Sequence, residues 1–312
     1  MQRAVLNLVI FHKPGWQRVS DFTTIKALMR ERAPEIRVHI VTPTSLLPPG
    51  FWPSCAEHPT ALFASTFMKV DPQVRGARLI PKVYTKFEEI TALRDAGLPV
   101  PDSVLLTPGT AIDEHDWGPF VVIKPNRGRQ GDGVRLVNAK DARWRDTAAL
   151  PDGHLWKGRE LVVQRFVDTG PLPACYRVMT VFGRKVYCVL SASTVETPAL
   201  DAATIPEEGI PIAANGKHRV RSLAYDDDVL SLAEDVHGKL THTPVMGIDI
   251  IRERETGKLY VLELNSGGLT WHISSDYGLR QQAEDGADKM AQFNALEVIA
   301  DAFIDATRKH AI

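Results

Sequence analysis

The distribution of apolar residues at the start of the chain predicts an α/β unit. Ala4–Phe11 and Arg37–Val41 are short apolar runs with the composition of β-strands. Between them, Ser20–Arg32 has the pattern of a helix, and Ser20 or Asp21 is its expected N-cap. The order strand, helix, strand favours two parallel strands joined by a helix.

From residue 82 onward the pattern predicts a mixture of helices and antiparallel strands. Thr85 is expected to cap a helix over Lys86–Ala96. Further helices are predicted at Asp226–Leu240 and Ala287–Arg308. Strands are predicted at Phe120–Lys124, Val134–Val137, Glu160–Val167, Tyr176–Ser191 (a hairpin turning at residues 182–184), Val245–Arg252 and Leu259–Leu264. The Pro-rich segment 43–59 is predicted to be a loop, and the polar segment 194–220 is interrupted by Pro and Gly.

Composition narrows the class of protein. The chain has 312 residues, of which 44% are hydrophobic and 24% charged, as in ordinary soluble globular proteins. Its net charge of -1 supplies no field that would attract nucleic acid or an anionic membrane, so neither is an expected partner. Its three cysteines have no metal-binding spacing, and no apolar run reaches the ~20 residues of a membrane span. We therefore expect a soluble cytoplasmic protein.

A glycine-rich loop after a predicted strand is the first chemical signal. Lys124 and Pro125 end the strand, and Gly128, Gly131 and Gly133 follow within the next eight residues. Glycines let backbone N–H groups approach phosphate oxygens, and Lys124 would add positive charge there. The loop is neither a Walker A motif nor a Rossmann fingerprint, because it leads into a strand. A plain glycine hairpin with an exposed lysine is the alternative interpretation.

Two acids and an amide form the second signal. In the predicted hairpin, Asp249 and Glu263 project from neighbouring strands, and Glu263 and Asn265 share a face. Such oxygen ligands suit Mg²⁺ that bridges nucleotide phosphates. The alternative is a solvated outer face, but acids between apolar neighbours are costly unless they are paired or bind metal.

The order and spacing of these motifs resemble the ATP-grasp superfamily, and most closely its RimK-like glutamate ligases and glutathione synthetases. The matching elements are Lys124-Pro125, Gly128-x-x-Gly131-x-Gly133, the strand Val163–Val167, Tyr176-Arg177-Val178, Gly247-Ile248-Asp249 and Glu263-Leu264-Asn265. The resemblance spans roughly Lys82–Gly268. It implies an α/β (α+β) ATP-grasp fold: an N-terminal pre-ATP-grasp domain at residues 1–81, then an ATP-grasp domain at 82–312 with lobes at about 82–165 and 166–312.

The resemblance also implies roles for individual residues around ATP. Lys86, with Lys82 as a competitor, and Lys124 would contact phosphates, and the three loop glycines would close over them. The strand end at Gln164, Arg165, Phe166 and Val167 would pair with adenine. Asp168 could replace the family's ribose-binding acid, whose position is occupied by Cys175.

Around the reacting centre, the resemblance assigns Arg177 to the γ-phosphate and the acyl phosphate. Arg219 would lie nearby. The expected metal ligands are Asp249, Glu263 and Asn265, for Mg²⁺ or Mn²⁺. Two departures stand out: Arg165 occupies a hinge position that is usually acidic, and an asparagine expected soon after Arg219 is missing.

The implied activity is an ATP- and Mg-dependent ligation of a carboxylate to an amine. The substrates would be an amino acid, a peptide or a small molecule, and a homo-oligomer is left open. A phosphotransferase acting on a hydroxyl group and a non-catalytic nucleotide-binding module are the alternatives. Trp271 could line an acceptor pocket, although core packing explains it at least as well. His218 or His272 could act as a general base for the incoming amine, although polar loop residues are the simpler interpretation.

Overall fold

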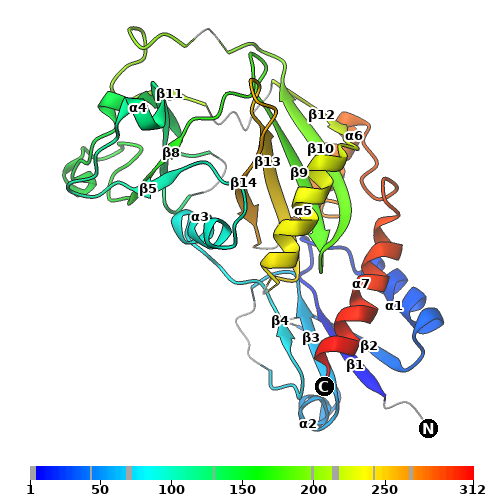
Figure 1. Ribbon diagram of the computed structural model, residues 1–312. Coiled ribbons are helices and arrows are strands. Elements are labelled where there is room, and N and C mark those ends of the chain that lie inside the picture. Colours follow the sequence, from blue (N-terminus) through cyan, green and yellow to red (C-terminus); the bar gives the residue numbers. More distant parts are fainter. Residues whose placement is uncertain are drawn as a thin grey trace.

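The computed structural model describes residues 5–42, 44–67, 72–128, 131–197, 200–212, 218–241, 243–266 and 270–312. These residues form three sheets with their helices, and the C-terminal helix returns to the N-terminal sheet (Figure 1). Among the helices of these residues, none has the length and apolar character needed to cross a bilayer.

The N-terminal sheet is parallel and has helices on both faces. Its strands, in the spatial order β2-β1-β3-β4, are β1 (Leu6–Phe11), β2 (Ile36–Val41), β3 (Thr60–Ala64) and β4 (Arg78–Leu79). Helices α1 (Val19–Arg32) and α7 (Ala295–His310) share a core with one face, and α2 (Phe51–Glu57) packs on the other. The predicted parallel strand pair is confirmed.

Two local predictions in this region are wrong. The predicted loop at residues 43–59 contains α2, because Phe51 and Cys55 pack on the apolar sheet face. Neither Ser20 nor Asp21 caps α1, which begins after Arg18 without a side-chain cap. The carboxylate of Asp21 instead accepts hydrogen bonds from Trp271 and Ser274, which are distant in sequence.

The second sheet is antiparallel and lies between residues 103 and 211. Its order is β11-β7-β6-β8-β5, with β5 (Ser103–Leu105), β6 (Phe120–Pro125), β7 (Arg135–Asn138), β8 (Leu161–Arg165) and β11 (Ile210–Pro211). The accompanying helices are α3 (Lys86–Asp95), α4 (Glu114–Trp117) and two 3₁₀ turns, Ala139–Asp141 and Thr147–Ala149. The predicted Thr85 cap of α3 is confirmed and forms a capping box with Glu88.

The third sheet carries most of the chemistry. Its order is β12-β10-β9-β13-β14, with β9 (Ala174–Val181), β10 (Arg184–Ser193), β12 (Arg219–Leu223), β13 (Val245–Arg252) and β14 (Leu259–Asn265). Helix α5 (Asp227–Lys239) covers one face, and α6 (Asp276–Asp285) lies beside β12 (Figure 1). Both predicted hairpins are confirmed.

Two predicted boundaries in the second half are wrong: the end of β8 and the start of the last helix. Strand β8 ends at Arg165, before Phe166 and Val167. The segment at 194–220 contains β11 and leads into β12, which pairing with β10 stabilises. The single predicted helix at Ala287–Arg308 starts only at Ala295, after the left-handed Asn294, and α6 precedes it. Pairing with distant strands and the left-handed backbone conformation of Asn294, rather than local propensity, determine where these strands and this helix begin and end.

Candidate functional site

A row of paired residues crosses the third sheet. Val189, Arg177, Asp249 and Glu263 face one another on β10, β9, β13 and β14 in turn. Directly paired residues project to the same face of a sheet. The sheet register therefore brings one cation and two carboxylates together on the face opposite α5.

Arg177 and Asp249 form a two-pronged ion pair. Nε and an Nη of Arg177 donate to the two carboxylate oxygens of Asp249 at 2.6 and 2.5 Å. Burial alone would lower the pKa of Arg177, but the charge and hydrogen bonds of Asp249 hold it above its ordinary value. Asn265 donates its amide to the same carboxylate at 3.3 Å, so Asp249 is held from two sides.

Lys86 makes the second ion pair of the site. It is the first residue of α3, and its Nζ lies 2.8 Å from a carboxylate oxygen of Glu263. Burial raises the pKa of Glu263, but Lys86 and other cations outweigh it and leave the pKa below its ordinary value. The Lys82 ammonium lies instead over the ring of Tyr84. The structure thus places Lys86, rather than Lys82, on the acid.

Lys124 lies in the same charged cluster. It is only 6% exposed, and its ammonium donates to the side-chain oxygen of Gln164 at 3.0 Å. Burial and the positive charge of Lys86 lower the pKa of Lys124 to about 8, opposed by Glu263 and Glu89. Lysines from α3 and β6 and an acid from β14 therefore surround one region between the two antiparallel sheets.

Glu89 is a member of this cluster that sequence reasoning missed. Its carboxylate accepts the backbone N–H of Leu264 at 2.6 Å and ties α3 to β14. Burial raises the pKa of Glu89 to about 8. An acid three residues after Lys86, beside the buried Ile90 of the same helix, was the available signal.

The glycine loop is anchored at its base. Gly131 and Gly133 have φ angles of 72° and 73°, a backbone conformation that residues with a side chain rarely adopt. A Cβ at Gly133 would also lie 2.8 Å from the ring of Pro125. Asp132, unusual in a phosphate loop, pairs with Arg159 at 2.7 Å. Gly128 is described, whereas the tip at residues 129–130 lies outside the described residues.

Of the predicted hinge residues, Arg165 is held by hydrogen bonds, whereas Phe166 and Val167 are held by apolar packing. The backbone N–H of Arg165 donates to Asp102 O at 2.8 Å, and its guanidinium donates to the hydroxyl of Tyr260 at 2.7 Å. Phe166 and Val167 pack in two separate apolar clusters. Asp168 accepts the N–H of Gly170 at 2.8 Å in a local turn.

Arg219 reaches the same side of the third sheet from β12. It pairs in register with Ser193, and an Nη donates to the carbonyls of Pro173 and Ser191 at 3.3 Å. Burial lowers its pKa, whereas Asp249 and Cys175 act in the opposite direction. Arg219 is thus within electrostatic reach of the Arg177–Asp249 pair.

Trp271 and its neighbour His272 have different surroundings: Trp271 belongs to the apolar core, and His272 lies beside the third sheet. Trp271 is completely buried in the core that the N-terminal helix shares, as its packing interpretation predicted. His272 stacks with Tyr187 at 6.5 Å between ring centroids. Arg221 and the buried Lys289, which we did not predict, lie on this side as well.

The oxygen ligands present fit a Mg²⁺ ion that also binds phosphate. Asp249, Glu263 and Asn265 supply two carboxylates and an amide from paired strands. Mg²⁺ is commonly held by one or two carboxylates together with substrate phosphates. Among the described residues, no three His, Cys, Asp or Glu side chains gather as an all-protein metal site. The donor set thus fits a metal shared with a nucleotide.

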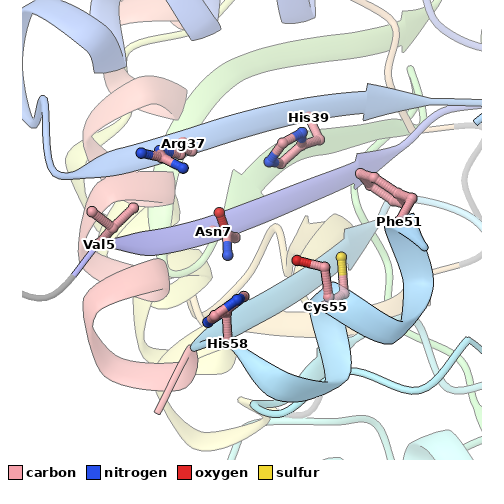
Figure 2. A pocket seen from close by; sticks show the side chains of 8 residues that line it. Val5, Asn7, Arg37, His39, Phe51, Cys55 and His58 are labelled. Atoms are coloured by element: carbon pink, nitrogen blue, oxygen red, sulfur yellow. The ribbon is translucent and has the colours of Figure 1, made fainter. Parts of the chain in front are cut away.

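A separate pocket of about 310 Å³ lies on the N-terminal sheet (Figure 2). Arg37 and His39 of β2, Asn7 of β1 and Cys55 of α2 line it. It contains none of the predicted site residues and no carboxylate.

Comparisons with known proteins identify the family and the fold. The ATP-grasp domain model matches residues 83–270, more than half of the 312-residue chain. The fold is similar to that of the ATP-grasp ligase PsnB complexed with precursor peptide PsnA2 and AMPPNP, at 15% identity and a TM-score of 0.50, over 98% of this chain and 99% of that chain. No curated protein sequence matches significantly.

Two further solved structures match at similar levels. D-cycloserine synthetase DcsG has 15% identity and a TM-score of 0.49, covering 96% of this chain and 99% of its own. D-alanine–D-alanine ligase from Bacillus anthracis has 13% identity and a TM-score of 0.48, covering 97% and 99%. The family assignment depends on the domain match, whose residues 83–270 include every charged residue of the site from Lys86 to Glu263. The chain belongs to the ATP-grasp family.

Proposed function

We propose that the protein is an ATP- and Mg-dependent ligase that joins a carboxylate to an amine. The observation that carries this proposal is the convergence of Arg177, Asp249, Glu263, Lys86 and Lys124 between two antiparallel sheets. A site that only holds a nucleotide would not need an arginine paired with one of the acids as well as two lysines.

The ion pairs suggest how charges are exchanged when substrates bind. Lys86 and Arg177 now neutralise Glu263 and Asp249. A nucleotide phosphate group would take over the two cations, and Mg²⁺ the two carboxylates, so each charge would keep a partner. Bound Mg²⁺ would neutralise negative charge on the phosphates.

In the proposed reaction, a carboxylate oxygen of the substrate attacks the γ-phosphorus of ATP. The new O–P bond forms as the bond to the β–γ bridging oxygen breaks, and ADP leaves. The amine then attacks the acyl carbon, loses a proton and displaces phosphate. Lys86, Lys124 and Arg177 would stabilise charge on the transferring group and hold the reactants in line. Closure of the glycine loop would exclude water from the acyl phosphate.

The side chains of Gln164 and Asp168 suggest a restricted role in nucleotide binding. Gln164 is buried and bound to Lys124 and Ser103, so we assign it to holding Lys124. For Arg165, Phe166 and Val167 we propose only backbone or apolar contact with adenine. Asp168 would contact ribose after giving up its turn hydrogen bond to Gly170.

A screen of amino acids and short peptides with Mg-ATP tests the proposal. We expect amine-dependent release of ADP and free phosphate in equal amounts, and mass spectrometry should show a product formed by loss of water between the two substrates. A phosphorylated product without free phosphate would identify a phosphotransferase instead. Nucleotide binding without any turnover across the panel would contradict ligase activity.

A further inference from the structure

A second group of cations lies beyond Arg177 on the third sheet. Arg221 is on β12 and pairs in register with Ser191 of β10. Lys289 lies in the segment between α6 and α7, and its Nζ is 5.6 Å from the ring centroid of Tyr187 on β10. Arg221 pairs with Asp285 of α6 at 3.4 Å, and the Lys289 ammonium donates to Gln281, one turn earlier on the same helix, at 3.3 Å. The two cations therefore lie along one face of α6.

Lys289 is unusually enclosed for a lysine. It is 2% exposed, and its Nζ donates to the side-chain oxygen of Gln281 at 3.3 Å. Burial lowers its pKa to about 8, with Asp285 opposing the change. In the described part of the chain, no carboxylate forms a salt bridge with Lys289. The acid that acts on it, Asp285, pairs with Arg221 at 3.4 Å. The single negative charge of Asp285 thus balances only one of the two positive charges of Arg221 and Lys289.

Hydrogen bonds from polar neighbours, rather than apolar packing alone, fix the position of Lys289. Its backbone N–H donates to the side-chain oxygen of Gln282 at 2.9 Å. The amide of Gln282 in turn donates to the carbonyl of His272 at 3.0 Å. A methionine would fill the space without the cost of burying a charge, so the excess of positive charge needs another explanation.

We propose that Arg221 and Lys289 bind the free carboxylate of an amino acid that serves as the amine substrate. A guanidinium and an ammonium together match a carboxylate in charge and in hydrogen-bond donors. Strand β12 lies two strands from β9, roughly 10 Å away, which side chains and a small amino acid can bridge. The amine would then face the acyl group beside Arg177. This inference rests on the proposed ligase function.

Turnover by the full chain gives the first test. With Mg-ATP, we expect amino acids to support phosphate release and their carboxamides to fail. Lys289→Met and Arg221→Gln should raise KM for the accepted amino acid by about 10- to 100-fold and leave KM for ATP unchanged. Arg221→Lys should recover much of the loss, because it keeps the charge.

Lys185→Met is the matched control. Lys185 is on β10, the strand that carries Tyr187, but it pairs with the partly exposed Glu234 at 3.7 Å. This variant should keep the wild-type KM for every substrate. Equal use of amino acids and carboxamides by the wild type, or an unchanged KM in Lys289→Met, would overturn the subsite while leaving the ligase proposal intact.

Binding tests the subsite even if no substrate is turned over. Succinate should raise the Tm of the Mg-ADP-loaded wild type and of Lys185→Met, whereas succinamide should not. The rise should be lost or clearly smaller in Lys289→Met. Equal succinate shifts in wild type and Lys289→Met would overturn the subsite. A lysine-dependent shift without turnover would support it and reject only the ligase function.

Discussion

At the scale of single residues, the site is built from opposite charges that neutralise one another. Arg177 holds Asp249 with two hydrogen bonds, and Lys86 holds Glu263. Leaving one member of a buried pair unmatched costs several times more than the pair itself contributes. The same residues therefore have to be tested for function and for folding.

Arg177→Ala should lower kcat by roughly 10²- to 10³-fold, because a positioned cation beside the transferring group would be lost. Phosphate release at saturating ATP measures this effect, and circular dichroism should verify that the variant is folded. Arg184→Ala is the control, since Arg184 pairs with Asp305 on the exposed surface. Unaltered turnover in a folded Arg177→Ala protein would remove its catalytic role.

Glu263→Gln should weaken binding of Mg-ATP by about 10- to 100-fold, because an anionic oxygen ligand would be lost. Calorimetry with and without Mg²⁺ measures the change, which should be far smaller in the absence of the metal. A loss of equal size under both conditions would mean that Glu263 acts only through Lys86.

Lys289 predicts a pH dependence of stability. Its pKa is lowered to about 8 in the folded protein, so between about pH 8 and 10.5 the unfolded chain binds the extra proton. The free energy of unfolding of the wild type should rise through this window relative to Lys289→Met. The facing charges are Asp285 on α6, Arg221 on β12 and Arg177 on β9, with the Tyr187 ring on β10.

Urea unfolding of wild type and Lys289→Met at pH 7 and pH 10 measures this difference. The stability advantage of the methionine variant should be largest at pH 7 and should shrink toward pH 10. A gap that stays constant with pH would show that the ammonium is charged in the folded protein across the whole range.

At the scale of secondary structure, helix starts and strand registers place the charged side chains. Thr85 and Glu88 cap α3 reciprocally, which fixes the position of Lys86 at its first turn. The pairing of Asp249 with Glu263 was predictable because the turn at residues 255–258 sets the register of that hairpin. The pairing of β9 with β13 was not, because 63 residues separate the two strands.

Thr85→Ala should lower the free energy of unfolding by about 1 kcal/mol, the usual cost of losing an N-cap. It should also raise KM for ATP, because Lys86 would lose its fixed place. Denaturant unfolding and steady-state kinetics test the two parts. Asp113→Ala, which removes the cap of the short exposed α4, should leave KM for ATP unchanged.

At the scale of the whole molecule, a buried contact joins the N-terminal helix to the segment after the acidic hairpin. Trp271 Nε1 donates to Asp21 at 2.8 Å, and Ser274 Oγ donates to the same oxygen. Helix α7 packs on the N-terminal sheet as well. A division of the chain at residue 82 remains a proposal, because both ends of the sequence contribute to one core.

Asp21→Ala should destabilise the protein by about 2–3 kcal/mol, because two buried donors would lose a charged acceptor. Denaturant unfolding measures this cost. Asp301→Ala is the control, since Asp301 pairs with Arg32 on the exposed surface and should change stability by less than about 1 kcal/mol. Similar losses in both variants would contradict the importance of the buried contact.

The sequence by itself determined the features that depend on neighbours along the chain. These include the parallel pair β1–β2, the capped helix α3, the two hairpins and the ordered Lys, Gly, Arg and acid motifs. Each follows from hydrophobic period, capping or turn chemistry, all of which act over a few residues.

Only the tertiary structure decided which distant residues meet. It brought Lys289 and Arg221 together against α6, and it buried Glu89 against Leu264. It also paired Asp21 with Trp271 rather than with the start of its own helix. These contacts depend on the order of strands in the sheets and on which sheet faces are buried, and the local sequence pattern predicts neither. A charge looks the same in sequence whether water or another side chain will neutralise it.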